Sequence, residues 1–288
     1  MLAPPGFVLL WSTGFVGPKF GLPYIEPMTF LSLRFALAAG ALALLALCLH
    51  APWPRTPGEI GHLAVSGALL HAGYLGGVFA ALDAGAEPGV IALIAGVQPA
   101  LVLILTRLAF GEQFRCRQYA GAVLGLAGVT FTVWHELTNG IGTAAGVGFA
   151  IFALIAISLG TVYQKRYCGR TNLVTSSLVQ FLVAFAVVGI LAVASEDGKI
   201  IWSWPLVITT AYLAIALSVG SILLFYALLR AGTAHQVSSL FFLVPPTTGL
   251  LSAVLLGESL SRESIIGMFI AALGVALVST VSSQHSGR

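Results

Sequence analysis

The chain has 288 residues, of which 58% are hydrophobic and only 8% are charged, and its mean hydropathy is +0.99. A soluble domain carries roughly 25% charged residues, so this composition excludes a water-soluble globular protein and requires much of the surface to face lipid. The formal net charge of +3 is too small to indicate a nucleic-acid partner. The three cysteines show neither metal-ligand spacing nor the even number typical of a disulfide framework.

Ten apolar segments follow one another along the chain, separated by short connections rich in proline, glycine and charge. A helix needs about 20 mostly apolar residues to cross a bilayer. The candidate helices occupy residues 4–21, 27–49, 60–82, 88–107, 117–134, 144–164, 172–194, 205–229, 236–256 and 264–282. Because no connection is long enough for a soluble domain, we predict an all-α integral membrane protein with ten transmembrane helices.

The basic residues between these helices predict how the chain crosses the membrane. Loops that face the cytoplasm carry an excess of lysine and arginine. The side shared by the two termini holds nine of them, and the opposite side holds three. The nine are Arg55, Arg107, Arg115, Arg117, Lys165, Arg166, Arg170, Arg230 and Arg288. We therefore expect both termini in the cytoplasm, with the protein in the inner (plasma) membrane of a bacterium.

The two halves of the chain match when one is shifted by 146 residues. This shift places Pro99 on Pro245 and the Gly-Glu pair at 111–112 on the pair at 257–258. Each copy holds five predicted spans, and because five is odd the copies must cross the membrane in opposite directions. The excess of loop arginine and lysine reverses between the copies, as inversion requires. The expected repeats are residues 1–142 and 143–288.

Inverted repeats are characteristic of secondary transporters, whose substrate site lies between the repeats near the middle of the membrane. One fold in two orientations supplies two states of similar energy, each open to one side. Some channels also contain inverted repeats, so a channel remains an alternative. A channel differs from a transporter in showing neither saturation nor trans-stimulation of the flux.

Several segments resemble a known family. LWSTGFVGPKFGL at 10–22, GVQPALVLILTRLAFGE at 96–112 and LVPPTTGLLSAVLLGE at 243–258 are similar to the EamA family of the drug/metabolite transporter superfamily. The resemblance implies ten helices around a central cavity lined by spans 1, 3, 4, 6, 8 and 9. It also implies export or exchange of small metabolites. YddG-like exporters of aromatic and other neutral amino acids are a plausible nearer match, with sugars, nucleobases and drugs as alternative cargoes.

Polar and aromatic residues inside the spans are the candidates for binding substrate, because polar groups are costly in a membrane and usually functional. His71 and Tyr74 are three residues apart and share one helix face. The candidates for the cavity wall are Trp11, Ser12, His71, Tyr74, Gln98, Ser158, Tyr163, Ser218, Ser221, Phe225, Phe241 and Phe242. The structural alternatives are interhelical hydrogen bonds, serines that bond back to their own helix, and interfacial anchoring for Tyr163.

Prolines and glycines within the spans are candidate hinges. A proline leaves a helix carbonyl without its donor, which is costly in lipid unless the carbonyl faces protein or water. The candidate hinges are Gly14, Pro18, Pro99, Gly160, Pro245 and Pro246. A structural polar role is expected for Arg34, its repeat counterpart Gln180, and the two loop glutamates Glu112 and Glu258.

Motifs for energy-driven or enzymatic chemistry are missing from the sequence. There is no phosphate-binding GxxxxGK[ST] loop and no acidic residue in mid-span. Ser66 and His71 are five residues apart, about 140° around a helix, which disfavours an intramembrane serine hydrolase. We therefore expect no enzymatic activity, no cofactor and no metal. The expected partners are a small-molecule substrate and the lipid bilayer, with one chain sufficient for uncoupled export or exchange.

Overall fold

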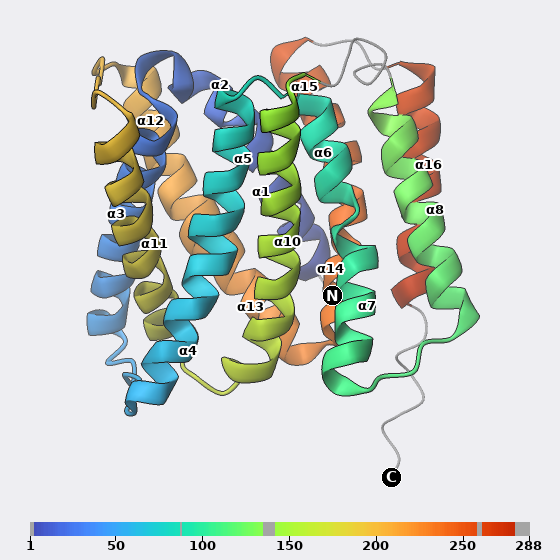
Figure 1. Cartoon of the computed structure of the whole chain (residues 1–288), viewed down its shortest axis with the longest axis horizontal. Coiled ribbons are helices and arrows are strands. Elements are labelled where there is room, and N and C mark those ends of the chain that lie inside the picture. Colours follow the sequence, from blue (N-terminus) through green and yellow to red (C-terminus); the bar gives the residue numbers. More distant parts are fainter. Residues whose placement is uncertain (1–2, 87, 135–141, 258–260, 280–288) are drawn as a thin grey trace.

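A computed structural model describes residues 3–86, 88–134, 142–257 and 261–279. Over this part of the chain the structure is helical, apart from loops and two isolated β-bridges that join Ile25 to Ile200 and Ala86 to Gly142. The helices run side by side in one bundle (Figure 1). A helix occupies each of the ten predicted segments.

In the described residues of the first half there are ten helical segments. They are α1 (Ala3–Val16), α2 (Pro18–Gly21), the 3₁₀-helix η1 (Leu22–Tyr24), α3 (Pro27–Cys48), α4 (Pro57–Gly67), the π-helix η2 (Ala68–Gly73), α5 (Tyr74–Asp83), α6 (Pro88–Gly96), α7 (Gln98–Phe110) and α8 (Cys116–Thr132). The segments α4, η2 and α5 form one continuous rod.

The second half repeats this order. Its segments are α10 (Ala144–Tyr167), α11 (Leu173–Ser195), α12 (Trp204–Tyr212), the π-helix η3 (Leu213–Ser221), α13 (Ile222–Ala231), α14 (Ala234–Ser239), the 3₁₀-helix η4 (Leu240–Leu243), α15 (Val244–Leu256) and α16 (Arg262–Ser279).

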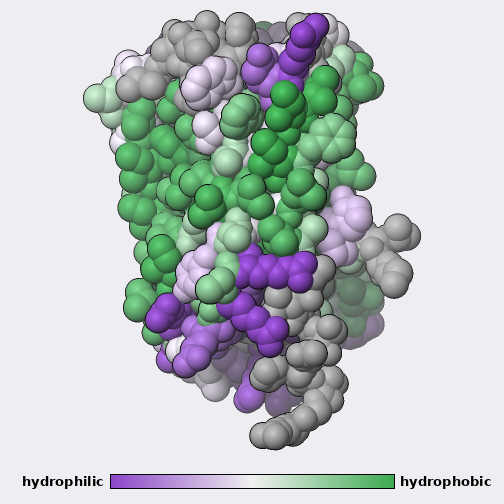
Figure 2. All heavy atoms as spheres, turned by 90° about the vertical axis from the view of Figure 1, so that its right-hand side faces the viewer, coloured by the Kyte–Doolittle hydropathy of each residue, from purple (hydrophilic) through white to green (hydrophobic). Residues whose placement is uncertain are grey.

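Seven described helical stretches are long and apolar enough to cross a membrane. They are Pro27–Cys48, Pro57–Asp83, Val90–Phe110, Ala144–Tyr167, Leu173–Ser195, Trp204–Ala231 and Ala234–Leu255. The other three predicted spans coincide with shorter helices, namely α1 with 14 residues, α8 with 17 and α16 with 18. Large apolar side chains lie exposed on these helices too, such as Val123 on α8 and Phe269 on α16. Figure 2 shows the resulting hydrophobic band between more hydrophilic ends.

The helix boundaries follow from local capping. Thr56 and Glu59 form a capping box at the start of α4, and the Asn172 side chain accepts two backbone N–H groups at the start of α11. Gly111 and Gly257 end α7 and α15 with φ of 67° and 70°. Only glycine adopts this left-handed conformation without strain, which explains why a glycine recurs at this position in both halves.

Irregular turns also recur at matching places in the two halves. The π-helices η2 and η3 lie in the middle of spans three and eight, and π-turns are frequent at functional sites. Span four breaks at Val97 before Pro99, and span nine narrows into η4 before Pro245. In both cases proline stands in the first turn of the next helix, where it needs no donor.

Two helix pairs make the most extensive contacts between the halves of the bundle. α3 packs along α11, and α8 packs along α16, at opposite sides of Figure 1. Glycines bring α8 and α16 into backbone contact: a Cβ atom on Gly128 would lie 2.3 Å from the Ala271 nitrogen, and one on Gly274 would lie 2.5 Å from the Gly125 nitrogen. Small residues are the usual means of such close approach in membranes.

Several predicted boundaries differ from the structure by up to three residues, such as the start of α4 at Pro57 and the end of α7 at Phe110, and two further differences are informative. The segment predicted at 4–21 breaks at Gly17, where α1 gives way to the short α2. The segment predicted to end at residue 164 continues to Tyr167. The charge of Lys165 does not end α10, because its ammonium group donates hydrogen bonds to the carbonyls of Leu229 and Gly232 and is satisfied inside the bundle.

Candidate functional site

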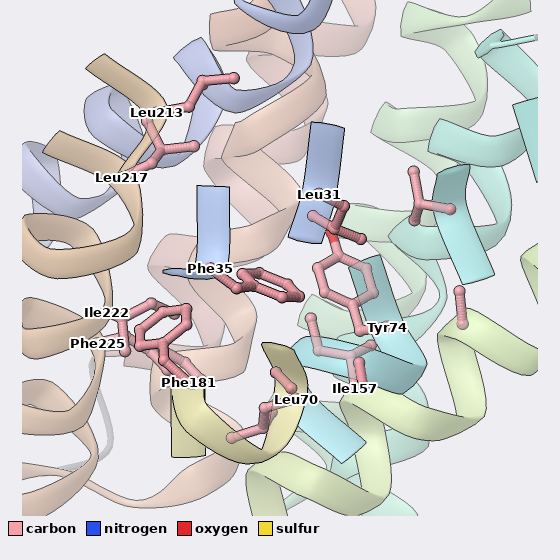
Figure 3. Packing of buried hydrophobic residues seen from close by; sticks show 14 of the residues in the cluster. Leu31, Phe35, Leu70, Tyr74, Ile157, Phe181, Leu213, Leu217, Ile222 and Phe225 are labelled. Carbon is pink, nitrogen blue, oxygen red and sulfur yellow. The ribbon is translucent and has the colours of Figure 1, made fainter. Parts of the chain in front are cut away.

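A cavity of about 90 Å³ lies within the bundle between α1, α3, the η2 and α5 region, α11 and η3. Its wall is mainly apolar, with a few polar side chains. The lining residues are Trp11, Gly14, Pro18, Arg34, Leu70, His71, Tyr74, Leu75, Val78, Phe79, Leu82, Phe181, Leu217, Ser218, Ser221 and Ile222. Figure 3 shows several of the apolar members, including Leu70, Tyr74, Phe181 and Leu217, converging from different helices.

Apart from Trp11 of α1 and Tyr74 of α5, the polar side chains of this cavity come from three elements. Arg34 of α3 donates from Nε to the Ser218 hydroxyl of η3 at 2.9 Å. His71 of η2 stacks on the ring of Phe181, with ring centroids 4.1 Å apart. The Nδ1 atom of His71 and the hydroxyl of Ser221 are buried and have no hydrogen-bond partner among the described residues. The widened π-turns carry both of these unpaired groups.

A chain of hydrogen bonds runs from His71 away from this cavity. The hydroxyl of Tyr226 donates to Oε1 of Gln180, so Nε2 of His71 is the donor in its 3.2 Å contact with the same hydroxyl. Gln180 donates to Gln164 at 3.2 Å, and Ser66 donates to the same Gln164 oxygen at 2.7 Å. We call these five side chains the polar barrier.

A second pocket, of about 220 Å³, lies on the other side of the polar barrier. Tyr226 and Gln164 form part of its wall, and its remaining residues are Lys165, Gly169, Arg170, Leu229 and Arg230. We call this end of the bundle the basic end. His71 belongs to the first cavity and Tyr226 to the second, so their contact separates the two.

An aromatic cluster stands beside the first cavity. Trp11 stacks on Tyr74 at 6.4 Å, is tilted against Phe225 at 5.8 Å and meets Phe241 edge-on at 5.0 Å. Phe7 completes the cluster. Trp11 therefore lines the cavity while it packs against four other aromatic rings.

The predicted cavity residues divide between the cavity wall and other parts of the bundle. Those in the wall are Trp11, His71, Tyr74, Ser218 and Ser221, together with the predicted hinges Gly14 and Pro18. Phe225 and Phe241 stand one layer behind, in the aromatic cluster.

Several predicted cavity residues lie elsewhere. Ser12 bonds to the carbonyls of Val8 and Val244, and Ser158 bonds back to its own helix at Leu154. Gln98 donates to the Ser238 hydroxyl between spans four and nine.

Two aromatic candidates also lie outside the cavity. Tyr163 contacts His62 near the basic end, at 2.7 Å between the hydroxyl and Nδ1. Phe242 fills the space over Gly125 on α8, where a Cβ would come within 2.3 Å of its ring.

The remaining predicted residues lie at helix junctions or in the barrier. Pro99, Pro245 and Pro246 stand at the start of α7 and α15. Gly160 faces Leu70, whose Cγ would lie 2.7 Å from an added Cβ. Gln180 belongs to the polar barrier.

The two glutamates with a predicted structural role are Glu112 and Glu258. Glu112 lies 3.5 Å from Nδ1 of His235, and its partial burial raises the pKa of its carboxyl against the opposing effect of Lys165. Glu258 lies outside the described residues.

Two important residues escape the sequence patterns. Phe181 and Tyr226 are aromatic and lie within spans, but no pattern in the sequence distinguishes them as candidates. The 146-residue shift carries a usable signal for Phe181, because it places this residue on Phe35. The sequence also gives no indication that Cys168 lies beside the polar barrier. Cys168 is 1% exposed, and burial raises the pKa of its thiol to about 12.

Several known proteins are similar to this chain in sequence or in fold. The profile of the EamA-like transporter family matches residues 6–134 and again residues 144–280. The chain is 24% identical to the uncharacterized transporter YvbV of Bacillus subtilis (strain 168), over 96% of this chain and 90% of that protein. It is also 24% identical to a "Probable amino-acid metabolite efflux pump" of Salmonella typhimurium (strain LT2), over 93% of this chain and 90% of that protein.

A solved crystal structure that is 21% identical in sequence superposes with a TM-score of 0.83, over 96% of this chain and 95% of that chain. At this level of sequence identity, the similarity shows a shared fold. The family and the names of the relatives indicate a transporter rather than an enzyme. Because one family matches both halves of the chain, the protein belongs to the EamA-like transporter family.

Proposed function

We propose that this transporter exports or exchanges small metabolites, foremost neutral and aromatic amino acids, by alternating access. In this proposal ten helices cross the membrane as two inverted repeats, residues 1–142 and 143–288. The double match of the family profile supports the repeats. So does the packing, in which α3 meets α11 and α8 meets α16, each the counterpart of the other.

Equivalent positions of the two halves have different surroundings, and this difference supports alternating access. The cavity wall and the polar barrier use equivalent positions of the two halves: Pro18 and Arg34 line the cavity, and their counterparts 146 residues later are Gln164 and Gln180 of the barrier. Inverted repeats predict such a difference when one side of the site is open and the other closed. Exchanging the two conformations would open the pocket at the basic end and close the cavity.

The basic end is proposed to face the cytoplasm of a bacterial inner membrane. Lys165, Arg170 and Arg230 gather there around the second pocket, as the excess of basic residues in cytoplasmic loops predicts. A single chain contains both halves of the site, so we propose that it works as a monomer. The aromatic surface of Trp11 and the names of the amino-acid efflux relatives favour amino acids as cargo.

Counterflow in proteoliposomes tests this function. Vesicles that contain the purified protein and unlabelled phenylalanine should take up external labelled phenylalanine several times faster than vesicles loaded with buffer. A channel would show equal initial rates in both and no saturation. An imposed pH gradient should change the rate much less than about tenfold, because no acidic residue lies in mid-span. Equal rates, or uptake that follows the gradient tenfold, contradict the proposal.

A further inference from the structure

Arg34 brings a positive charge into the cavity wall without a protein counterion. Its side chain is buried, only 4% exposed, and Nε makes its hydrogen bond to Ser218. None of the aspartates and glutamates in the described ranges lines the cavity. Within the described part of the chain, an ion pair joins Lys199 to Asp197, His235 contacts Glu112 at 3.5 Å, and neither contact involves Arg34. Nε is the Arg34 nitrogen that has a hydrogen-bond partner among the described residues. The two terminal nitrogens are not among the fully buried unpaired atoms, so they have access to the cavity.

A purely structural role does not account for this arrangement. A buried charge without a partner is destabilising in a membrane, and arginine cannot avoid this by losing its proton. The counterpart Gln180 provides the comparison. This neutral amide accepts a hydrogen bond from Tyr226 and donates one to Gln164, and it stands in a closed barrier without a charge. Hydrogen bonding between helices at this position therefore needs no cation.

The hydrogen bond of Nε orients the two terminal nitrogens of the Arg34 guanidinium group. Since Nε is held by the Ser218 hydroxyl, the planar group has one defined direction, with the two terminal nitrogens left for another acceptor. Such a pair of parallel donors matches the two oxygens of a carboxylate. The rest of the wall beside it is apolar, with Leu70, Val78 and Leu217 among its members.

We propose that Arg34 binds the carboxylate of the transported substrate, with Ser218 as the positioning residue, and that the carboxylate is required for recognition. The cargo is then a small carboxylate with an apolar side chain. This inference rests on the proposed transport function and names the group on the substrate that the site recognises. With no acidic side chain in the wall, a primary amine alone has no anionic partner, whereas a carboxylate neutralises Arg34.

Ligand series that differ in one group test this inference on the purified full-length protein. Isothermal titration measures Kd for phenylalanine, 3-phenylpropionate and phenethylamine, and for leucine, 4-methylpentanoate and 3-methylbutylamine. At least one carboxylate of each series should bind, and the amines should bind at least tenfold more weakly. Arg34→Gln should weaken binding of the carboxylates by about tenfold to hundredfold. Arg34→Lys, which keeps the charge but loses the paired donors, should lie between the two.

Arg107→Gln is the matched control, because Arg107 is an exposed arginine of α7 that bonds to Tyr119 outside the cavity. It should leave every Kd within twofold of the wild-type value. Any of three results would overturn the inference: amines bind as tightly as carboxylates, wild-type protein binds no carboxylate, or the Arg34→Gln protein keeps its affinity. The comparison of carboxylates with amines uses wild-type protein alone, so it does not depend on the folding of a variant.

The outcomes separate this inference from the transport function. Counterflow of phenylalanine that is equally fast in wild type and Arg34→Gln would leave the function in place and remove the role of Arg34. Arg34-dependent binding of 3-phenylpropionate without amino-acid counterflow would keep the role of Arg34 and exclude amino acids as the cargo.

Discussion

Replacing Gly128 with leucine is expected to lower the melting temperature of the purified protein by roughly 6–12 °C. A Cβ at this position would stand 2.3 Å from the nitrogen of Ala271 and 2.7 Å from the carbonyl oxygen of Gly267, both backbone atoms of α16. Backbone cannot move aside as a flexible side chain can, so α8 and α16 must separate along their whole contact. Overpacking of this kind costs about 3 kcal/mol. Thermal unfolding followed by tryptophan fluorescence measures the effect.

Gly148→Leu is the matched control for this substitution. Gly148 lies on α10, where an added Cβ would meet no atom within 4 Å. The substitution should change the melting temperature by no more than about 2 °C, since exposed positions contribute little. An equal fall in both variants would show that leucine in place of any membrane glycine is destabilising. An unchanged Gly128→Leu protein would mean that α8 and α16 do not meet as described.

Removing one hydroxyl from the polar barrier is expected to open the basic end. Tyr226→Phe deletes the group that bonds to both Gln180 and His71. Leaving a buried polar atom unpaired costs about 1–3 kcal/mol, and that cost applies only while the barrier is closed. The equilibrium should therefore shift about tenfold or more toward the state open at the basic end.

Cys168 reports this shift. In protein with Cys48→Ser and Cys116→Ser, Cys168 is the remaining cysteine. Its burial and its pKa of about 12 keep the reactive thiolate scarce at neutral pH, so a maleimide should react slowly with the closed state. Tyr226→Phe should accelerate labelling about tenfold.

Tyr212→Phe is the control for the loss of a hydroxyl. It removes a comparable but exposed hydroxyl that bonds to Thr13 and should leave the labelling rate unchanged. Equal labelling rates in the two variants would exclude the barrier as a gate.

Hydropathy predicts where the helices lie, because lipid selects long apolar runs whatever their neighbours. The helices over 27–49 and 172–194 are within one residue of α3 and α11. The prolines at 99 and 245 likewise mark real breaks in spans four and nine. These are local properties, and the sequence contains them.

The direction in which a side chain points is not contained in the same patterns. A helix that is apolar all round offers no amphipathic asymmetry, so Ser12 and Ser218 are indistinguishable in sequence. The structure places Ser218 at the cavity and turns Ser12 toward Val8 and Val244. The π-turns add a further rotation that ideal helix periodicity cannot supply.

Arg34 shows what the repeat alone does not predict. Polar residues at both equivalent positions favour one structural role for Arg34 and Gln180. The structure gives the two side chains different surroundings, a cavity wall for Arg34 and a closed hydrogen-bond network for Gln180. Equivalent positions in an inverted repeat have the same place in the fold but opposite states in any single conformation. The difference between them is therefore informative about transport.

Alternating access is tested most directly by labelling both ends of the pathway in one protein. Cys168 reports the basic end, and Leu82→Cys, in the cavity wall, reports the other end. With Cys48 and Cys116 changed to serine, the maleimide reaction of each site is timed with and without a saturating substrate, and with Tyr226→Phe. Alternating access predicts opposite changes: whenever labelling at Cys168 accelerates, labelling at position 82 slows. Acceleration at both sites together would show a pathway open from end to end and would contradict alternating access.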